Sequence, residues 1–391
     1  MSKQLFIKTE DQRAWLQKLE ELEDSFKGRA QLVDELARFP KENIQALRDI
    51  GYTKITLPKQ LGGEGFSIYD AVLLHETLAS YDASTALSIG WTLLTVGDLF
   101  DNEQWEKKTL DEFAKEVERG AIINRAVSEF AMGSPARGGR PATSARKTAS
   151  GWLINGRKNY TTGAPELDYF LTSAWIEEQG KIGFFLIPRE AEGVSIDETW
   201  DVISMRGTGS HDLVLENVHL ESSSLVEIPS YSTGFKLNGW LLLIPATYLG
   251  IAQAARDYAV HFATTHTPNS LNGPISELPN VQSLIGEIDL ELATARFTLY
   301  GAAEAFADPV RKEHVVHEIN IAKHFVTNSA LSIVDKAMRI VGAKSLQRNN
   351  PLQRYYRDVR AGLHNPPMDD MTIKKLAETA ISQFNEQKER V

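Results

Sequence analysis

The sequence contains no cysteine among its 391 residues. The absence of cysteine excludes disulfides, thiolate nucleophiles, zinc–cysteine sites and cysteine-held iron–sulfur clusters. Basic residues are not in surplus either, because 42 Lys and Arg face 52 Asp and Glu, for a formal net charge of −10. This acidic balance argues against a nucleic-acid-binding protein, which needs a basic face. It does not exclude a small anionic ligand, since a local pocket can oppose the global charge.

Long apolar runs are missing as well. The most apolar stretches, residues 86–100 and 239–252, are interrupted by Gly, Thr, Asp or Pro. Both are shorter than a membrane span, which needs about 18–20 apolar residues. The first residues also lack the basic and then apolar pattern of a secretory signal. We therefore expect a cytoplasmic protein without a membrane span.

Three common catalytic signatures are absent from the sequence: G-x-x-x-x-G-K-S/T, H-E-x-x-H and G-x-S-x-G. The glycine-rich segment 62–65 does not match a dinucleotide fingerprint and is typical of a turn between helices. His314 and His317 lie in a charged segment, which favours a solvated helix face over a metal site. We predict no metal site, so demanding chemistry would require an organic cofactor.

The hydrophobic pattern divides the chain into three regions. We predict an N-terminal α-helical domain over 1–120, with clear helical periods at 40–50 and 68–78. Short β-branched and aromatic runs between Gly, Pro, Asn and Ser predict a middle antiparallel β-barrel domain over 121–226. Long helical patterns return over 227–391 and predict a C-terminal four-helix bundle. The predicted fold class is therefore α+β and multidomain.

Four segments stand out from this background: 126–135, 151–163, 204–212 and 354–360. The first two are turns that carry hydroxyl groups and free backbone N–H groups, which can hold a polar heteroaromatic ring and phosphates. Each segment alone is an ordinary turn, but their joint order and spacing resemble those of the acyl-CoA dehydrogenase superfamily. The resemblance extends over nearly the whole chain and matches the helix–β–helix order.

The resemblance implies an FAD site built from separate segments. The family's threonine-glutamate-proline-x-x-glycine-serine stretch is similar to residues 128–134, and its asparagine-glycine-x-lysine stretch is similar to residues 155–158. The terminal serine, Ser134, would contact the substrate. Arg339 stands where the family has glutamine before a glycine pair and could meet the flavin diphosphate by charge. The implied FAD-binding residues are Val127, Ser128, Gly133, Tyr160, Thr161, Thr162, Arg339 and Gly342.

The resemblance also implies chemistry. It indicates an FAD-dependent oxidoreductase acting on CH–CH bonds, which would remove two hydrogens from an acyl-CoA thioester and pass a hydride to flavin N5. It further implies an electron-transfer flavoprotein as electron acceptor, a role in fatty acid metabolism and a homotetramer. A correctly placed base must take the α-proton in such a reaction. The family's glutamate position, however, falls at Pro366, and a second family position near Asn238 or Trp240 holds no carboxylate.

A related branch of the superfamily suggests an alternative. Flavin-dependent monooxygenases of this fold need no glutamate base, and their arginine-aspartate pair followed by histidine is similar to Arg357-Asp358 with His364. Histidine can move protons near neutral pH, so His364 is our candidate catalytic residue. The competing interpretation is a surface histidine in a loop before two prolines. A third hypothesis is a non-catalytic flavin- or acyl-CoA-binding protein.

Other charged residues have simple structural explanations. Glu76 is interpreted as an exposed or ion-paired helix residue, with a buried acid near the ligand as the alternative. Asp369 and Asp370 would cap the last helix, or supply a displaced base. Arg206 would anchor a turn, or meet a phosphate.

Overall fold

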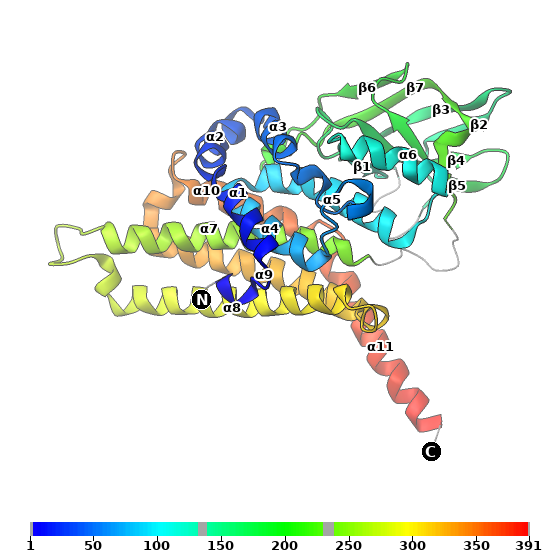
Figure 1. Ribbon diagram of the computed structural model, residues 1–391. Coiled ribbons are helices and arrows are strands. Elements are labelled where there is room, and N and C mark those ends of the chain that lie inside the picture. The colour runs from blue at the N-terminus through cyan, green and yellow to red at the C-terminus, as the bar shows by residue number, and fades with distance from the viewer. Residues whose placement is uncertain (1–2, 132–138, 230–237, 390–391) are drawn as a thin grey trace.

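The computed structural model describes residues 3–131, 139–229 and 238–389. Helices come first along the chain, strands follow, and helices return at the end (Figure 1). This helical, mostly β and again helical order confirms the predicted fold class. No helix in the described ranges is long and apolar enough to cross a bilayer.

The N-terminal helices begin at side chains that cap them. Thr9 and Gln12 form a capping box at α1, Ser67 and Asp70 form another at α4, and Asp82 caps α5. Such caps satisfy N–H groups that a helix leaves unpaired in its first turn. The helices of this region are α1 (Glu10–Glu20), α2 (Glu23–Leu36), α3 (Lys41–Asp49), α4 (Ile68–Tyr81), α5 (Ala83–Asn102) and α6 (Lys107–Glu118).

The middle region forms one eight-stranded sheet in the described residues, with the order β6-β7-β3-β2-β4-β5-β8 and with β1 beside β4. The sheet is mixed, which corrects the expected antiparallel barrel. β1 and β2 lie one after the other along the same edge of β4, and both run parallel to it. No pairing of β6 with β8 closes the sheet within the described ranges. The strands are β1 (Ile123–Ala126), β2 (Ser144–Lys147), β3 (Gly151–Lys158), β4 (Tyr169–Ile176), β5 (Lys181–Pro188), β6 (Val194–Asp197), β7 (Asp212–Glu221) and β8 (Leu225–Glu227).

Long helices form the C-terminal region. These are α7 (Leu243–Thr265), α8 (Pro279–Ala307), α9 (Val316–Val341), α10 (Pro351–Asp358) and α11 (Asp369–Glu389). α7, α8 and α9 pack against one another, and α4 packs on both α7 and α8. α11 contacts α9 along its first half, as far as Thr379, which lies 3.4 Å from His317, and its end projects away from the body (Figure 1). The fourth helix against the C-terminal trio is thus α4 from the N-terminal region, which corrects the expected bundle partner.

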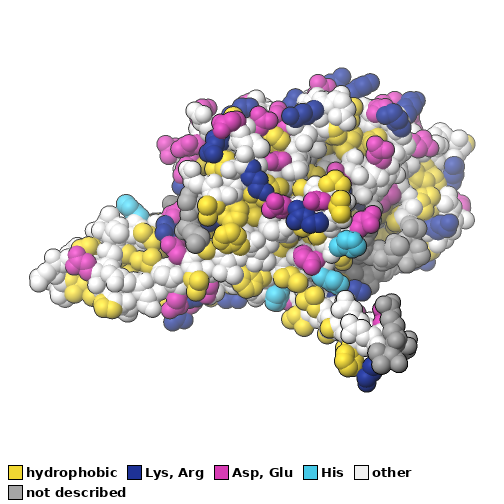
Figure 2. All heavy atoms as spheres, turned by 60° about the horizontal axis from the view of Figure 1, so that its bottom comes forward, with side chains coloured by type: hydrophobic (Ala, Val, Ile, Leu, Met, Phe, Trp, Pro, Cys, Tyr) yellow, Lys and Arg dark blue, Asp and Glu magenta, His cyan; other side chains and the backbone are white. Residues whose placement is uncertain are grey.

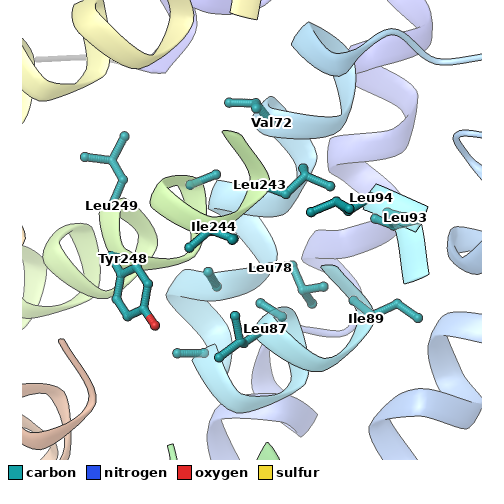
Figure 3. Packing of buried hydrophobic residues seen from close by; sticks show 14 of the residues in the cluster. Val72, Leu78, Leu87, Ile89, Leu93, Leu94, Leu243, Ile244, Tyr248 and Leu249 are labelled. Atoms are coloured by element: carbon teal, nitrogen blue, oxygen red, sulfur yellow. The ribbon is translucent and has the colours of Figure 1, made fainter. Parts of the chain in front are cut away.

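The core joins the two helical regions. Burying a leucine or isoleucine side chain stabilises the fold by about 1.5–3 kcal/mol, so this shared core holds α4, α5 and α7 in fixed positions. The core residues that α4, α5 and α7 contribute include Val72, Leu78, Leu87, Leu93, Leu94, Leu243 and Ile244 (Figure 3).

On the molecular surface, acidic and basic side chains are interspersed over the face shown in Figure 2.

Candidate functional site

Three of the four motif segments meet at one place in the sheet region. The Asn159 N–H donates to the carbonyl oxygen of Ser128 at 2.9 Å, which joins the first segment to the second. The Thr161 N–H donates to the carbonyl oxygen of His211 at 3.1 Å, which joins the second to the third. The sequence spreads these segments over about eighty residues, and the fold makes them neighbours.

Buried hydroxyl groups form a chain beneath the second segment. Thr162 Oγ1 lies 2.9 Å from Ser210 Oγ, which lies 2.8 Å from Thr208 Oγ1. Thr208 Oγ1 donates to the carbonyl oxygen of Met205 at 2.9 Å, and Asn124 Nδ2 donates to the carbonyl oxygen of Thr162 at 3.0 Å. The position of Thr162 is therefore set by the turn around Met205, whose φ of +53° lies in the left-handed region.

A buried ion pair holds the first segment against the second. Glu129 Oε1 accepts from Lys158 Nζ at 2.5 Å and from Thr143 Oγ1 at 2.7 Å, and Glu129 Oε2 accepts from the Ala142 N–H at 2.6 Å. Burial opposes the charge of Glu129, but these hydrogen bonds outweigh it and lower the pKa of the carboxyl. Burial lowers the pKa of Lys158 to about 8. Gly156 lets the strand approach Thr143, since a Cβ there would lie 2.6 Å from the Thr143 Cα.

Several buried polar atoms around these segments lack a partner. Asn124 Oδ1, Asn159 Oδ1, Thr161 Oγ1 and Thr172 Oγ1 have no hydrogen bond among the described residues. Buried polar groups rarely stay unpaired in folded proteins. A bound heteroaromatic ring with donors and acceptors on its edge would supply partners here, so the residues present fit a flavin.

The remaining candidates of the first two segments lie at the rim. Val127 and Ser128 follow β1 and are half-buried. Tyr160 is 59% exposed, with a φ of +54°, and meets the Trp200 ring edge-on at 6.1 Å. An exposed aromatic ring beside polar groups suits a planar ligand. Two further predicted residues, Gly133 and Ser134, lie outside the described residues.

Arg339 and Gly342 are not brought to this place. Arg339 lies in the last turn of α9, is exposed and pairs with Asp335 one turn earlier. Gly342 is the first residue after α9 and has a φ of +69°. None of the hydrogen bonds in the described part of the chain joins either residue to the sheet segments.

The fourth segment reaches the site through its aspartate. Met205 N–H donates to Asp358 Oδ1 at 2.6 Å. His364 follows six residues later and is exposed, without a side-chain hydrogen bond in the described part of the chain. The next residue, Asn365, accepts from the Tyr248 hydroxyl at 2.5 Å. His364 thus sits on a turn whose neighbours on both sides are anchored.

The other charged residues follow their structural interpretations. Glu76 is buried and paired with Arg296, Nη2 to Oε1 at 2.6 Å. Arg206 donates to the carbonyl oxygens of Asp34 and Val202, at 2.7 and 2.9 Å, and so anchors the turn.

The start of α11 is held by its aspartate. Asp369 accepts from Asn328 at 2.9 Å and lies 3.0 Å from His324 Nδ1, so this carboxylate ties α11 to α9. It is therefore a poor candidate for a displaced base.

The sequence did not identify two residues that matter here. Asp34 on α2 pairs with Arg357 of the fourth segment, and no local pattern marks it. The second residue is Glu129. Lys158 belongs to a recognised motif, but nothing in the sequence indicates that Glu129 is its ion-pair partner.

A cavity of about 860 Å³ lies elsewhere, between α1, α2, α4, α7 and α10. Glu76 lies at its edge, together with Tyr81, Tyr258 and Arg354. Neither His364 nor any described residue of the predicted FAD site lines it, so we place the site at the converging segments because chemistry, rather than volume, marks them.

Models of acyl-CoA dehydrogenase domains match most of the chain. The N-terminal domain model matches residues 9–116, the middle domain model residues 124–218 and the C-terminal domain model residues 242–365.

Individual relatives are similar over most of their length. YdbM of Bacillus subtilis, provisionally named an acyl-CoA dehydrogenase, is 57% identical over 96% of this chain and 99% of its own. The 3-(aryl)acrylate reductase of Clostridium sporogenes is 32% identical over 84% of this chain and 87% of its own. The L-evernosamine nitrososynthase of a Micromonospora species is 28% identical over 84% of this chain and 80% of its own.

Solved structures share the fold. Butyryl-CoA dehydrogenase from Megasphaera elsdenii superposes with a TM-score of 0.85 at 20% identity, over 96% of this chain and 99% of that one. TdsC from Paenibacillus, solved with FMN and indole, superposes with a TM-score of 0.85 at 22% identity, over 95% and 97%. With three domain models matched in order, the chain belongs to the acyl-CoA dehydrogenase family.

Proposed function

We propose that this protein is an FAD-dependent oxidoreductase that dehydrogenates an acyl-CoA thioester between its α- and β-carbons. The observation that carries the proposal is the convergence of Ser128, Thr161 and Thr162 at one place, surrounded by buried polar atoms without partners. The similarity to YdbM and to the other family members supports the same conclusion. The electron acceptor would be an electron-transfer flavoprotein.

The chain's own groups have distinct roles in this proposal. The backbone of Val127 and Ser128 and the hydroxyls of Thr161 and Thr162 would hold and orient the flavin ring, with Tyr160 at its edge. Preorganised donors of this kind need no rearrangement during the reaction. Bound flavin supplies a two-electron acceptor for the substrate's hydride.

Two parts of the proposal rest on residues that the structure does not place at the converging segments. Ser134 would contact the substrate, and Arg339 with Gly342 would meet the diphosphate of a flavin. Because Arg339 has no described link to the sheet segments, we propose that it serves the flavin of a second copy, within a homotetramer.

His364 is the proposed proton-handling residue. It takes this role because Pro366 replaces the expected carboxylate, and because its turn is anchored at Asp358 and Asn365. An exposed imidazole on an anchored turn can exchange its proton with solvent between turnovers.

Anaerobic titration of the purified flavoprotein with acyl-CoAs of increasing chain length tests the reaction. We expect the visible absorbance band of the oxidised flavin to bleach with at least one substrate. Adding an electron-transfer flavoprotein should restore it. If no acyl-CoA bleaches the flavin, the dehydrogenase assignment fails.

A second candidate is a two-component monooxygenase that uses reduced flavin and oxygen. Pro366 at the expected base position favours it, as does the similarity to L-evernosamine nitrososynthase. Supplying reduced FAD or FMN with oxygen should then give substrate-dependent oxygen uptake and an oxygenated product. Flavin or acyl-CoA binding without turnover in either assay would instead identify a binding protein.

A further inference from the structure

Arg357 ties three parts of the fold together. Its Nη1 and Nη2 donate to Asp34 Oδ1 and Oδ2 at 3.0 and 2.5 Å. The guanidinium therefore binds the carboxylate of Asp34 on α2 through two parallel hydrogen bonds. Nη1 also donates to the carbonyl oxygen of Ile203 at 2.7 Å, in the loop between β6 and β7. Bidentate arginine–carboxylate pairs fix geometry as well as adding energy. One side chain on α10 therefore holds both an N-terminal helix and a loop of the sheet region.

Asp358 continues this link into the site. Its side chain is 3% exposed, and its Oδ1 receives the Met205 N–H at 2.6 Å. Met205 is itself buried in the left-handed region of backbone space. A non-glycine residue keeps such a conformation only when its surroundings over-determine it. Asp358 is one of the groups that do so here.

The Met205 turn leads directly to the proposed flavin face. The Met205 carbonyl oxygen receives Thr208 Oγ1, which contacts Ser210 Oγ, which contacts Thr162 Oγ1. Hydrogen bonds on both sides of the Met205 backbone therefore link Asp358 to Thr162.

Asp358 also marks the beginning of the segment that carries His364. The segment continues as the short helix η12 (Val359–Leu363), which packs on α7 and α9. Its far end is held by the hydrogen bond from Tyr248 to Asn365. Movement of Asp358 would therefore displace the His364 turn and the Met205 turn together.

We propose that Arg357 and Asp358 are positioning residues. They fix the flavin face at Thr161–Thr162 and the His364 turn relative to one another, without contacting the flavin or the substrate. This inference rests on the proposed function, because it takes Thr161–Thr162 as the flavin face. It extends that function by naming the residues whose contacts fix the sheet region relative to the C-terminal helices. Removing the Asp358 carboxylate leaves the buried Met205 N–H without its acceptor, and such a loss is costly.

The test uses the full-length protein with Asp358→Ala, Asp358→Asn and Arg357→Lys. Asparagine keeps an oxygen that can accept from Met205, whereas alanine does not. Lysine keeps the positive charge of Arg357 but lacks the planar pair of N–H donors that binds both oxygens of Asp34. Arg360→Lys is the matched control, because Arg360 lies one turn away and is exposed.

Two measurements separate positioning from simple stability. The first is amide hydrogen exchange of residues 204–210 in flavin-free protein, at a temperature at which all variants are folded. The second is the FAD dissociation constant together with the midpoint potential of the bound flavin. We expect Asp358→Ala to speed exchange in 204–210, weaken FAD binding about tenfold or more and shift the potential. Asp358→Asn should restore most of the affinity, Arg357→Lys should weaken it less than alanine does, and Arg360→Lys should match the wild type.

The outcomes discriminate clearly. A folded Asp358→Ala protein with wild-type exchange, affinity and potential overturns the inference. If alanine prevents folding, equal behaviour of Arg357→Lys and wild type in both measurements overturns it. Failure of the wild type to bind any flavin would instead defeat the proposed function, and the exchange measurement would still decide whether Asp358 holds the Met205 turn.

Discussion

Glu129 and Lys158 form a salt bridge of 2.5 Å in which the two side chains are 4% and 0% exposed. The two residues come from different motif segments, and the Asn159 N–H bonds to Ser128 directly beside them. The pair therefore joins the two segments that the family resemblance assigns to the flavin. An uncompensated buried charge is expensive, so neither residue can be removed alone without consequence.

Replacing Lys158 by methionine should destabilise the protein by about 3–5 kcal/mol, because Glu129 would remain buried without its cation. Chemical denaturation followed by circular dichroism measures this change. Glu129→Leu combined with Lys158→Met should recover part of the loss, since the unpaired charge is then gone. The exposed pair Lys107–Asp111 supplies the control, and Lys107→Met should cost about 0.5 kcal/mol or less. A loss for Lys158→Met as small as that of the control would contradict the prediction.

A second buried pair should affect stability alone. Arg296 and Glu76 are each 1% exposed, and the Tyr300 hydroxyl donates to Glu76 Oε2 at 2.7 Å. Arg296→Met should cost about 3–5 kcal/mol, and Tyr300→Phe about 1.5–3 kcal/mol, because it removes a hydrogen bond to a charged group. Flavin affinity should not change in either variant at a temperature at which both are folded. A selective loss of flavin binding would show that this network belongs to the site.

His75 should make the protein less stable in acid. It is fully buried, its Nε2 lies 3.1 Å from Thr247 Oγ1, and burial lowers its pKa from 6.5 to about 3. Between those pH values His75 binds a proton in the unfolded chain but not in the folded protein. The free energy of unfolding therefore falls as pH falls from about 6.5 toward 3. The slope from one such group is at most about 1.4 kcal/mol per pH unit. Urea denaturation at several pH values should show a shallower slope for His75→Gln, and an unchanged slope would refute the assignment.

Asp358 should contribute a slope of the opposite sign. Burial raises its pKa from 3.8 to about 7, so between those values the folded protein keeps a proton that the unfolded chain releases. Its contribution is fully present below about pH 3.8 and is lost as pH rises through about 7. Arg354, Arg357, Asp34 and Tyr248 are the charged or titratable groups that act on it.

The difference between wild type and Asp358→Asn isolates this contribution from those of other carboxylates. Denaturation of both proteins between pH 4 and pH 8 should show the stability advantage of the wild type, relative to the variant, declining as pH rises. An advantage that grew with pH would show that Asp358 is held charged instead.

His364→Ala should slow reduction of the flavin by substrate about 10²- to 10⁴-fold, the usual contribution of a general base, while FAD affinity stays the same. Stopped-flow absorbance measures the reduction. His314→Ala serves as the control, because His314 is exposed on the turn before α9. Wild-type reduction rates in His364→Ala would assign the proton transfer to another group.

Local patterns predicted the order of the regions because they depend on neighbours along the chain. Alternating apolar residues such as Phe185 and Ile187 face the core side of β5, as the period of a strand requires. The C-terminal helices follow their apolar periods closely. The parallel pairing of β1 and β2 with β4 was missed, since strand neighbours are chosen by tertiary packing and not by the local period.

The candidate site was predictable only as segments. Residues 127–128 and 160–162 were marked by their motifs, whereas the partners that hold them lie far away in the sequence. Met205 and Asp358 are separated by 153 positions, and no periodicity or spacing relates them. Arg339 was likewise marked by its motif, and the structure adds that it lies exposed beside Asp335.

The sequence by itself determined which chemistry this protein can use and which elements it forms. Without cysteine it has no thiol chemistry, and its turn segments carry the hydroxyls and amides that a flavin needs. The tertiary structure decided how those segments are held, through Glu129 with Lys158 and through Asp358 with Met205. The physical reason is burial: charges and amides removed from water must find partners, and only the folded chain shows which distant residue each one meets.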